Sequence, residues 1–319
     1  MSASRDLASP QDPTFLKLPR QGLDALGGAR VVVVGAAHGS PYKPGEVSHA
    51  ADAPAALRAA SARFAYQLQQ YDFDLRATLF PGGETYGAVD AGDVETSPDD
   101  GEGNRARIEA AIRAVLAAGA VPVLLGGDDS VPVPAFRAYE GRGPITVLQL
   151  DAHVDWGDVI QGNPYGYGST MRRAAEHPWI TGMVQVGIRG LGSGDAWQHD
   201  DARAFGSRIV EMRHLRREGI EHVLRHLPQG GQVLVTIDCD ALDPTFLPAV
   251  NMPTPGGLTY GDVVDLLHGA ASRARIVGLN LVELVPGRDD PHKLSAMTAA
   301  RIATVGLGLI LAQAGQGGA

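Results

Sequence analysis

Short apolar runs alternate with longer helical patterns along most of this chain. The apolar runs predict buried strands at 30–34, 121–125, 145–150, 183–188, 209–211, 233–238 and 276–282. Helices are expected at 54–70, 108–118, 131–139, 170–176, 214–226, 260–271 and 294–312. A repeated strand-then-helix order predicts a mostly parallel sheet with helices on both faces, which is an α/β fold.

Two acids and a histidine follow the apolar run 145–150. Asp151, His153 and Asp155 stand at alternate positions, and a strand repeats every two residues, so their side chains are expected on one face. Carboxylates and an imidazole that converge at a strand end suit a hard or borderline divalent metal ion. The alternative is an edge strand with solvated charges. The run is typical of a buried parallel strand, however, and open α/β sheets place their ligands at the carboxyl ends of such strands.

A second apolar run, 233–237, also ends in carboxylates, at Asp238 and Asp240. Burying several carboxylates close together costs several kcal/mol per ion unless cations compensate. One cation cannot neutralise so many acids, so the pattern predicts a dinuclear metal site. Cys239 stands between the two acids, and alternation points its thiol away from them, as a small buried residue behind the site.

A third run, 121–125, leads into Gly-Gly-Asp-Asp-Ser at 126–130. The two glycines let the backbone approach a site closely, and either Asp128 or Asp129 can join the acidic cluster. Ser130 is as consistent with a helix N-cap as with a chemical role. A glycine- and proline-rich loop at 35–53 follows the first strand, and long loops of this kind often carry function.

Composition limits the class of protein. The 319 residues, 44% hydrophobic and 20% charged, suffice for one large domain, and we expect an N-terminal arm at 1–28 and a single α/β domain at 29–319. A net charge of −9 disfavours nucleic acid and anionic membranes as partners. The single cysteine excludes an internal disulfide, and we recognise no signal peptide and no apolar run long enough to span a bilayer. We therefore expect a soluble, cytoplasmic protein.

Three segments together resemble the signatures of the ureohydrolase family, which includes arginase, agmatinase and guanidinobutyrase. They are 126–130, the Asp-Ala-His-Val-Asp segment 151–155 and the Asp-Cys-Asp-Ala-Leu-Asp-Pro segment 238–244, and the similarity extends over about 30–312. The resemblance implies an arginase-like three-layer α/β/α fold with an eight-stranded, mostly parallel sheet. It also implies trimers or hexamers and two Mn²⁺ ions per subunit, or less often Ni²⁺.

The resemblance also implies roles for individual residues. Asp151, His153, Asp155, Asp238 and Asp240 would be metal ligands. A bridging water would attack the guanidinium carbon, releasing urea and an amine, and Asp155 would pass a proton to the leaving amine. Glu283 matches the glutamate that anchors the guanidinium, the alternative being a solvated acid at a strand end.

The chain departs from the family pattern at two histidines. Asp129 stands where the family has its first histidine ligand; it can still bind a cation through oxygen, or it can swing away and leave one metal weakly held. With Asp129 the inner shell carries five carboxylates instead of four, so the cluster is more negative. Tyr167 stands where the family has a proton-shuttle histidine, and a phenol is a poor shuttle at neutral pH but a good donor. His38 is our candidate to replace it, unless it is a plain loop histidine.

The loop after Asp155 bears on the substrate. It contains Trp156, Asn163, Tyr165 and Tyr167 and lacks a clear set of groups for an α-amino acid head. An aromatic pocket suits a small guanidino compound, such as an agmatine-like guanidine, a guanidino acid, free guanidine or a biguanide, although these aromatics can equally just pack the loop.

Three functions remain open. The first is a binuclear hydrolase of a guanidino compound. The second is a weak or inactive homologue that stabilises or regulates a partner ureohydrolase subunit in a hetero-oligomer. The third is an amidine or formimino hydrolase.

Overall fold

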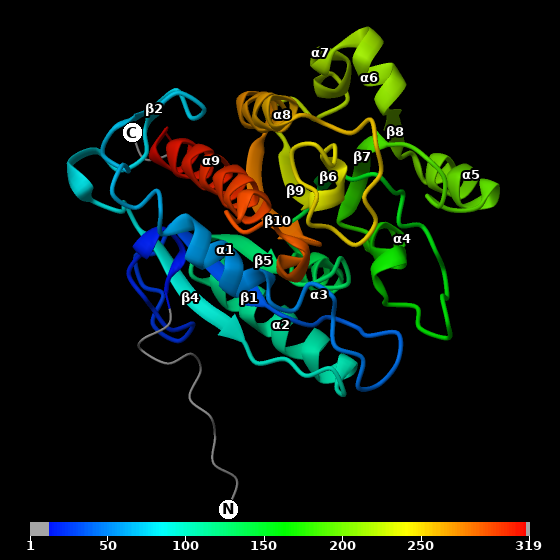
Figure 1. Cartoon of the computed structure of the whole chain (residues 1–319), viewed down its shortest axis with the longest axis horizontal. Helices are drawn as coiled ribbons and strands as arrows, with labels where there is room; N and C mark the ends of the chain where they lie inside the picture. Colours follow the sequence, from blue (N-terminus) through cyan, green and yellow to red (C-terminus); the bar gives the residue numbers. More distant parts are fainter. Residues whose placement is uncertain (1–12, 317–319) are drawn as a thin grey trace, which may run out of the picture.

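Eight parallel strands form one central sheet in the computed structural model, which describes residues 13–316 (Figure 1). In spatial order the strands are β4 (Ala88–Val94), β1 (Val31–Ala36), β5 (Val121–Gly126), β10 (Arg275–Val282), β9 (Gln232–Asp238), β6 (Ile145–Leu150), β7 (Ile180–Ile188) and β8 (Arg208–Glu211). A separate two-stranded hairpin, β2 (Tyr71–Asp72) and β3 (Ala77–Thr78), lies outside this sheet.

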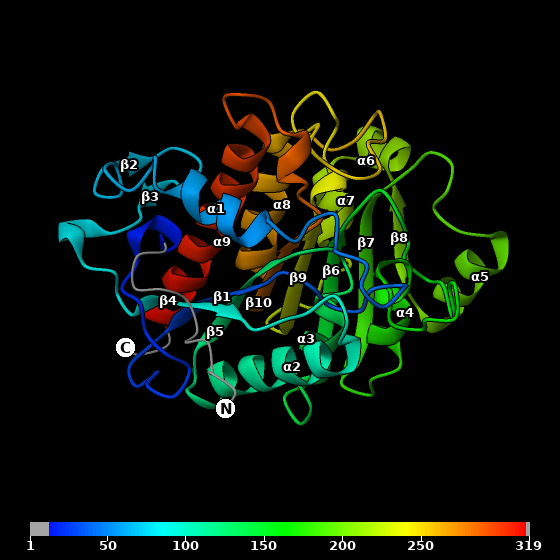
Figure 2. The ribbon, with the colours of Figure 1, turned by 60° about the horizontal axis from the view of Figure 1, so that its bottom comes forward.

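Helices cover both faces of the sheet, as Figure 2 shows for α1, α8 and α9 on one side and α2 and α3 on the other. The helices are α1 (Ala53–Ser61), α2 (Gly101–Ala117), α3 (Pro132–Arg137), α4 (Thr170–Ala175), α5 (Ala196–Phe205), α6 (Met212–Glu218), α7 (Ile220–Leu224), α8 (Tyr260–Arg273) and α9 (Leu294–Gln316). Alternation divides the strands between two cores: Val31 and Val33 face α1 and α9, whereas Val32 and Val34 face α2. The predicted three-layer α/β/α fold is therefore confirmed.

Strand β4 and helix α5 were not predicted from the sequence. β4 carries Asp90 and Gly92 among its apolar positions, and Asp90 is fully buried because it forms an ion pair with Arg58 of α1. The predicted helix 54–70 ends at Ser61, and the predicted helix 214–226 is divided into α6 and α7 at Gly219, whose φ is +75°. A residue with positive φ cannot continue a right-handed helix.

The described part of the expected N-terminal arm is packed against the domain. Residues 1–12 lie outside the described residues. Phe15 is fully buried in the core, and its N–H donates to Asp90 of β4. The N–H of Leu16 donates to Ser61 at the end of α1. Residues 13–28 thus pack against the domain expected at 29–319.

Helix α9 corrects the expectation that no apolar run is long enough to span a bilayer. By length and composition, its segment Leu294–Gly315 is apolar enough to cross a bilayer. Most of this segment is buried inside the fold, where it packs against α1, α8 and the sheet. The apolar character of α9 is therefore explained by its place as a core helix.

Candidate metal centre

Four neighbouring strands deliver the acidic residues to one edge of the sheet. β5, β10, β9 and β6 lie side by side and run parallel, so their carboxyl ends meet. Ile237 of β9 is in register with Leu150 of β6 and Leu281 of β10. Asp238, which follows Ile237, and Asp151, which follows Leu150, therefore lie at the same level along the edge of the sheet.

The loop after β6 brings its side chains together in a way that strand alternation does not. β6 ends at Leu150, and residues 151–155 form a turn in which Asp155 has a φ of +45°. Within this turn the Asp151 carboxylate accepts a hydrogen bond from the His153 N–H at 2.6 Å. The expectation of three side chains on one strand face is therefore wrong, although the residues still converge.

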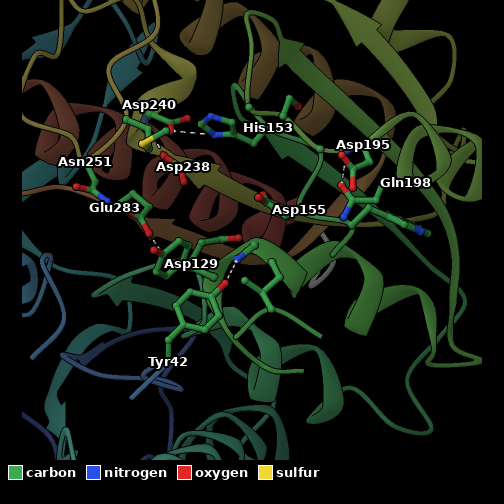
Figure 3. Close-up of a pocket in the computed structure, with 18 of the residues that line it drawn as sticks. Tyr42, Asp129, His153, Asp155, Asp195, Gln198, Asp238, Asp240, Asn251 and Glu283 are labelled. Atoms are coloured by element: carbon green, nitrogen blue, oxygen red, sulfur yellow. Dashed lines mark hydrogen bonds and ion pairs between the residues drawn. The ribbon is translucent and has the colours of Figure 1, made fainter. Parts of the chain in front are cut away.

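Potential ligand atoms fall into two groups that share Asp151. One group contains Asp151, His153 and Asp240, and the other contains Asp129, Asp151 and Asp155. Within each group the atoms lie within 4.8 Å of one another. Figure 3 shows Asp240 and His153 on one side of Asp238, with Asp129 and Asp155 below it.

A short 3-10 helix after β9, η4 (Cys239–Ala241), turns Asp240 toward His153. The Asp238 carboxylate accepts the N–H of Asp240 at 2.7 Å, and Asp240 Oδ2 lies 3.1 Å from Nδ1 of His153. Cys239 is fully buried in the apolar core, so the prediction that its thiol points away is confirmed.

Burial and mutual repulsion govern the charges of this cluster. Burial, and then the negative charge of neighbouring acids, raises the pKa of Asp129, Asp155 and Asp238 well above the usual range. Burial opposes the charge on His153, but hydrogen bonds and attraction from Asp151 and Asp240 outweigh it and raise the pKa of His153 to about 10. So many buried acids cannot all ionise unless cations compensate.

One atom of the cluster fits a cation directly. Among residues 13–316, Asp129 Oδ2 is buried without a hydrogen-bond partner. An orphaned buried carboxylate oxygen is costly, and a bound cation satisfies it. Oxygen ligands with one imidazole suit Mn²⁺ and related divalent ions.

Ser130 and Asp128 have structural contacts. Ser130 donates to Asp128 Oδ1 at 2.5 Å and accepts the N–H of Ser40 at 2.7 Å. Helix α3 begins at Pro132, and no side chain caps it. The N-cap prediction for Ser130 is therefore wrong, and of the two adjacent acids it is Asp129 that lines the cavity.

Glu283 is buried beside this cluster, 6% exposed, and so is not a solvated strand-end acid. Its φ of +65° turns it back at the end of β10, and its N–H donates to Gly127 at 2.9 Å. Its Oε1 accepts the N–H of Asp129 at 2.9 Å, and its Oε2 lies 2.5 Å from Nε2 of His49. The sequence reasoning missed His49; the only signal was its position in the long loop 35–53.

Tyr167 lies in the cavity wall, whereas His38 does not. The Tyr167 ring packs edge-on against Tyr42, with 4.7 Å between centroids, and against His49 at 5.5 Å. His38 is buried with Nδ1 3.4 Å from the Thr96 hydroxyl, and burial lowers its pKa. Its expected proton-transfer role therefore has no support in the geometry. The histidine beside the centre is His49.

The acids open into a cavity of about 570 Å³. Beyond the cluster its wall includes Tyr42, Trp156, Ile160, Gln161, Tyr167, Ser193, Asp195, Gln198, Asn251 and Met252. No lysine or arginine is among its lining residues within 13–316.

Only part of the predicted substrate loop faces the cavity. Trp156 and Tyr167 line it. Tyr165 instead stacks against Arg105, whose Cζ lies 4.2 Å from the centroid of the Tyr165 ring. Asn163 donates hydrogen bonds to the backbone carbonyls of Ser40 and Pro41. These last two residues hold the loop in place.

Comparisons with known proteins agree with this geometry. The model of the arginase family matches residues 29–307. Proclavaminate amidinohydrolase of Streptomyces clavuligerus is 32% identical over 284 residues, 86% of each chain. Its solved structure superposes with a TM-score of 0.80 at 29% identity, covering 97% of this chain and 99% of that one.

Other relatives match over a smaller part of their length. Arginase 1, mitochondrial, of Arabidopsis thaliana is 36% identical over 186 residues, 57% of this chain and 52% of the relative. Guanidinopropionase of Pseudomonas aeruginosa is 36% identical over 209 residues, 63% of this chain and 64% of the relative. The chain thus spans about half the length of the plant arginases it matches.

Proposed function

We propose a function from the premise that this chain belongs to the arginase family of hydrolases. The protein cleaves a small cationic guanidino compound to urea and an amine, with two divalent metal ions. One observation carries the proposal. Two groups of potential ligands share Asp151, and their other members, Asp129, Asp155, His153 and Asp240, line a cavity that also holds the buried carboxylate of Glu283. Such a site combines a metal cluster with an acceptor for a planar cation.

In this proposal Asp129, Asp151 and Asp155 would hold one metal ion, while Asp151, His153 and Asp240 would hold the other. Asp238 lines the same cavity and would add a further carboxylate ligand. Mn²⁺ suits this oxygen-rich set best, and Ni²⁺ is the second choice. When bound, the cations supply Lewis acidity and positive charge, which is the chemistry that makes a nucleophile of water at neutral pH.

The protein's own groups bind the substrate and carry a proton from the attacking water to the leaving amine. Glu283 pairs with the guanidinium and holds its central carbon beside the cluster. Asp155 carries the proton to the leaving amine nitrogen. Its Oδ2 accepts a hydrogen bond from Gln149 at 2.8 Å, so we assign the transferred proton to Oδ1. In the protein without metal, burial and the charges of Asp151 and Asp129 raise the pKa of Asp155.

The charge of the cavity selects the class of guanidine. Asp195 adds a further carboxylate to the wall, which also includes the neutral Gln198 and Gln161 and the apolar Trp156 and Met252. A substrate carboxylate would find no lysine or arginine among the described lining residues. A guanidine with a neutral or cationic tail, such as agmatine, an alkylguanidine or free guanidine, is therefore favoured over a guanidino acid.

A panel assay tests this proposal. Protein loaded with Mn²⁺ or Ni²⁺ is assayed for urea from agmatine, methylguanidine, guanidine, biguanide, arginine and 4-guanidinobutyrate. We expect urea from a carboxylate-free guanidine, with kcat/KM at least about tenfold above that for 4-guanidinobutyrate, which is about 1.4 kcal/mol of discrimination. Asp195→Asn, a neutral match in shape, should narrow that ratio. Absence of urea from every guanidine refutes the proposal, and a preference for the guanidino acid refutes the charge argument.

A second candidate is a catalytically weak subunit that stabilises a related partner. The replacement of two histidines, by Asp129 and Tyr167, favours it. Metal analysis discriminates: fewer than about one tightly held ion per chain after loading would refute the dinuclear site and favour this candidate. Light scattering would test the further proposal of a homotrimer or homohexamer, and cell fractionation that of a cytoplasmic location.

The third candidate, an amidine or formimino hydrolase, uses the same cavity on a different substrate. Release of formamide and an amine from a formimino compound, without urea from any guanidine, would favour it over the leading proposal.

A further inference from the structure

A loop histidine touches the guanidinium-binding carboxylate without entering the cavity. His49 and Glu283 are 234 positions apart, yet Nε2 and Oε2 are 2.5 Å from each other. His49 is not among the lining residues within 13–316, and its side chain is 23% exposed. Any effect of His49 on a substrate therefore passes through Glu283.

The contacts of Glu283 leave a defined pair of acceptor positions. A carboxylate offers about four lone-pair positions, two on each oxygen. The N–H of Asp129 occupies one on Oε1, and His49 occupies one on Oε2. One position remains on each oxygen, and a guanidinium presents two parallel N–H donors to such a pair.

We propose that His49 is a positioning residue, whose hydrogen bond to Oε2 fixes the plane of the Glu283 carboxylate for two-point binding of a guanidinium. The inference rests on the proposed function, because it assigns that ligand to Glu283. Without His49 the carboxylate keeps one anchor, the N–H of Asp129, and rotates about its last torsion. A freely rotating acceptor loses orientation entropy when it binds a planar cation.

The surroundings of the imidazole support the assignment. Tyr167 packs edge-on against the His49 ring and against Tyr42, so the imidazole is held from the side by an aromatic wall. This gives Tyr167 a role without proton transfer.

Three substitutions at position 49 test whether Glu283 needs a hydrogen-bond donor that reaches its Oε2 atom. His49→Gln retains an N–H donor of similar reach, His49→Asn has a donor that is too short, and His49→Leu has none. His214→Gln, on the exposed surface of α6, is the matched histidine control. Binding of guanidinium chloride at millimolar concentration is measured by calorimetry on metal-loaded protein. Metal content and thermal unfolding are recorded for each variant.

We expect His49→Leu and His49→Asn to weaken guanidinium binding by about 10- to 100-fold, the range for a hydrogen bond to a charged group. His49→Gln should stay within a few-fold of the wild type, and all variants should keep their metal. With the best substrate of the panel, the loss should fall mainly on KM. Equal affinities for the Gln and Asn variants overturn the inference, as does wild-type affinity in the Leu variant. Because guanidinium binding needs no turnover, this result stands apart from urea release, whose absence would refute the proposed function alone.

Discussion

Replacing Asp129 tests how the acidic cluster is balanced. The side chain is 3% exposed, its Oδ2 has no hydrogen-bond partner among the described residues, and it faces Asp151 and Asp155 within 4.8 Å. Two unit charges at that distance repel by about 3.5 kcal/mol at an effective dielectric constant of about 20. Two such neighbours make about 7 kcal/mol of gross repulsion, which protonation partly relieves. Without metal, Asp129 therefore destabilises the fold.

The isosteric change Asp129→Asn should raise the free energy of unfolding of the metal-free protein by about 1–3 kcal/mol, because it removes a buried unpaired charge. The sign of the pH dependence follows. A carboxyl group with a raised folded pKa binds more protons in the folded state, so its destabilising effect appears as pH rises above the unfolded pKa. The metal-free wild type should lose stability as pH rises above about 4, the unfolded pKa of Asp, and the Asn variant should lose less.

Metal binding should respond in the opposite direction. Asn removes an anionic ligand, so affinity should fall by about 10- to 100-fold. Asp129→His supplies an imidazole instead and should retain or exceed wild-type affinity. Calorimetric unfolding with chelator and metal titration of the three proteins are the assays. A metal-free Asn variant less stable than the wild type would refute the repulsion argument. Loss of metal from the His variant would refute the view that this ligand position is tolerant.

Three further changes probe other parts of the molecule. Arg58→Met leaves the buried Asp90 carboxylate without its cation and should cost about 3–5 kcal/mol in denaturant unfolding; a loss below about 1 kcal/mol would contradict this. Asp243 accepts hydrogen bonds from the turn around it, which lower its pKa to about 2, so its stabilisation is present above the usual Asp pKa and disappears as pH falls toward 2. The melting-temperature difference between wild type and Asp243→Asn should therefore be full at neutral pH and shrink in acid. Tyr167→His restores a group that titrates near neutrality and should raise kcat at least about tenfold; an unchanged kcat–pH profile would show that protons leave by another route.

The sequence pattern was most informative where local chemistry and fold agree. Apolar runs predicted seven of the eight strands, because a strand buried on both faces must be apolar throughout. β4 escaped because its buried Asp90 needs the guanidinium of Arg58, a partner on another element. Helix α5 escaped because Ala202 is its only buried residue, so it has almost no apolar face to detect.

The acidic cluster was predictable for a topological reason. Parallel strands all end at the same edge, so acids that follow several strands must meet there, whatever the strand order. The path of the backbone into the cluster was not predictable. Asp155 reaches the cluster because its own φ is positive, and not because of strand alternation.

The sequence by itself determined the class of fold, the residues that could hold metal and the likeness to a hydrolase family, since periodicity and short motifs are local properties. Only the tertiary structure decided which distant groups touch. It brought His49 rather than His38 to Glu283, and turned Tyr165 away from the cavity while Tyr167 stayed in its wall. The physical reason is that contacts between loops depend on how the whole sheet twists and packs, and no local pattern encodes that.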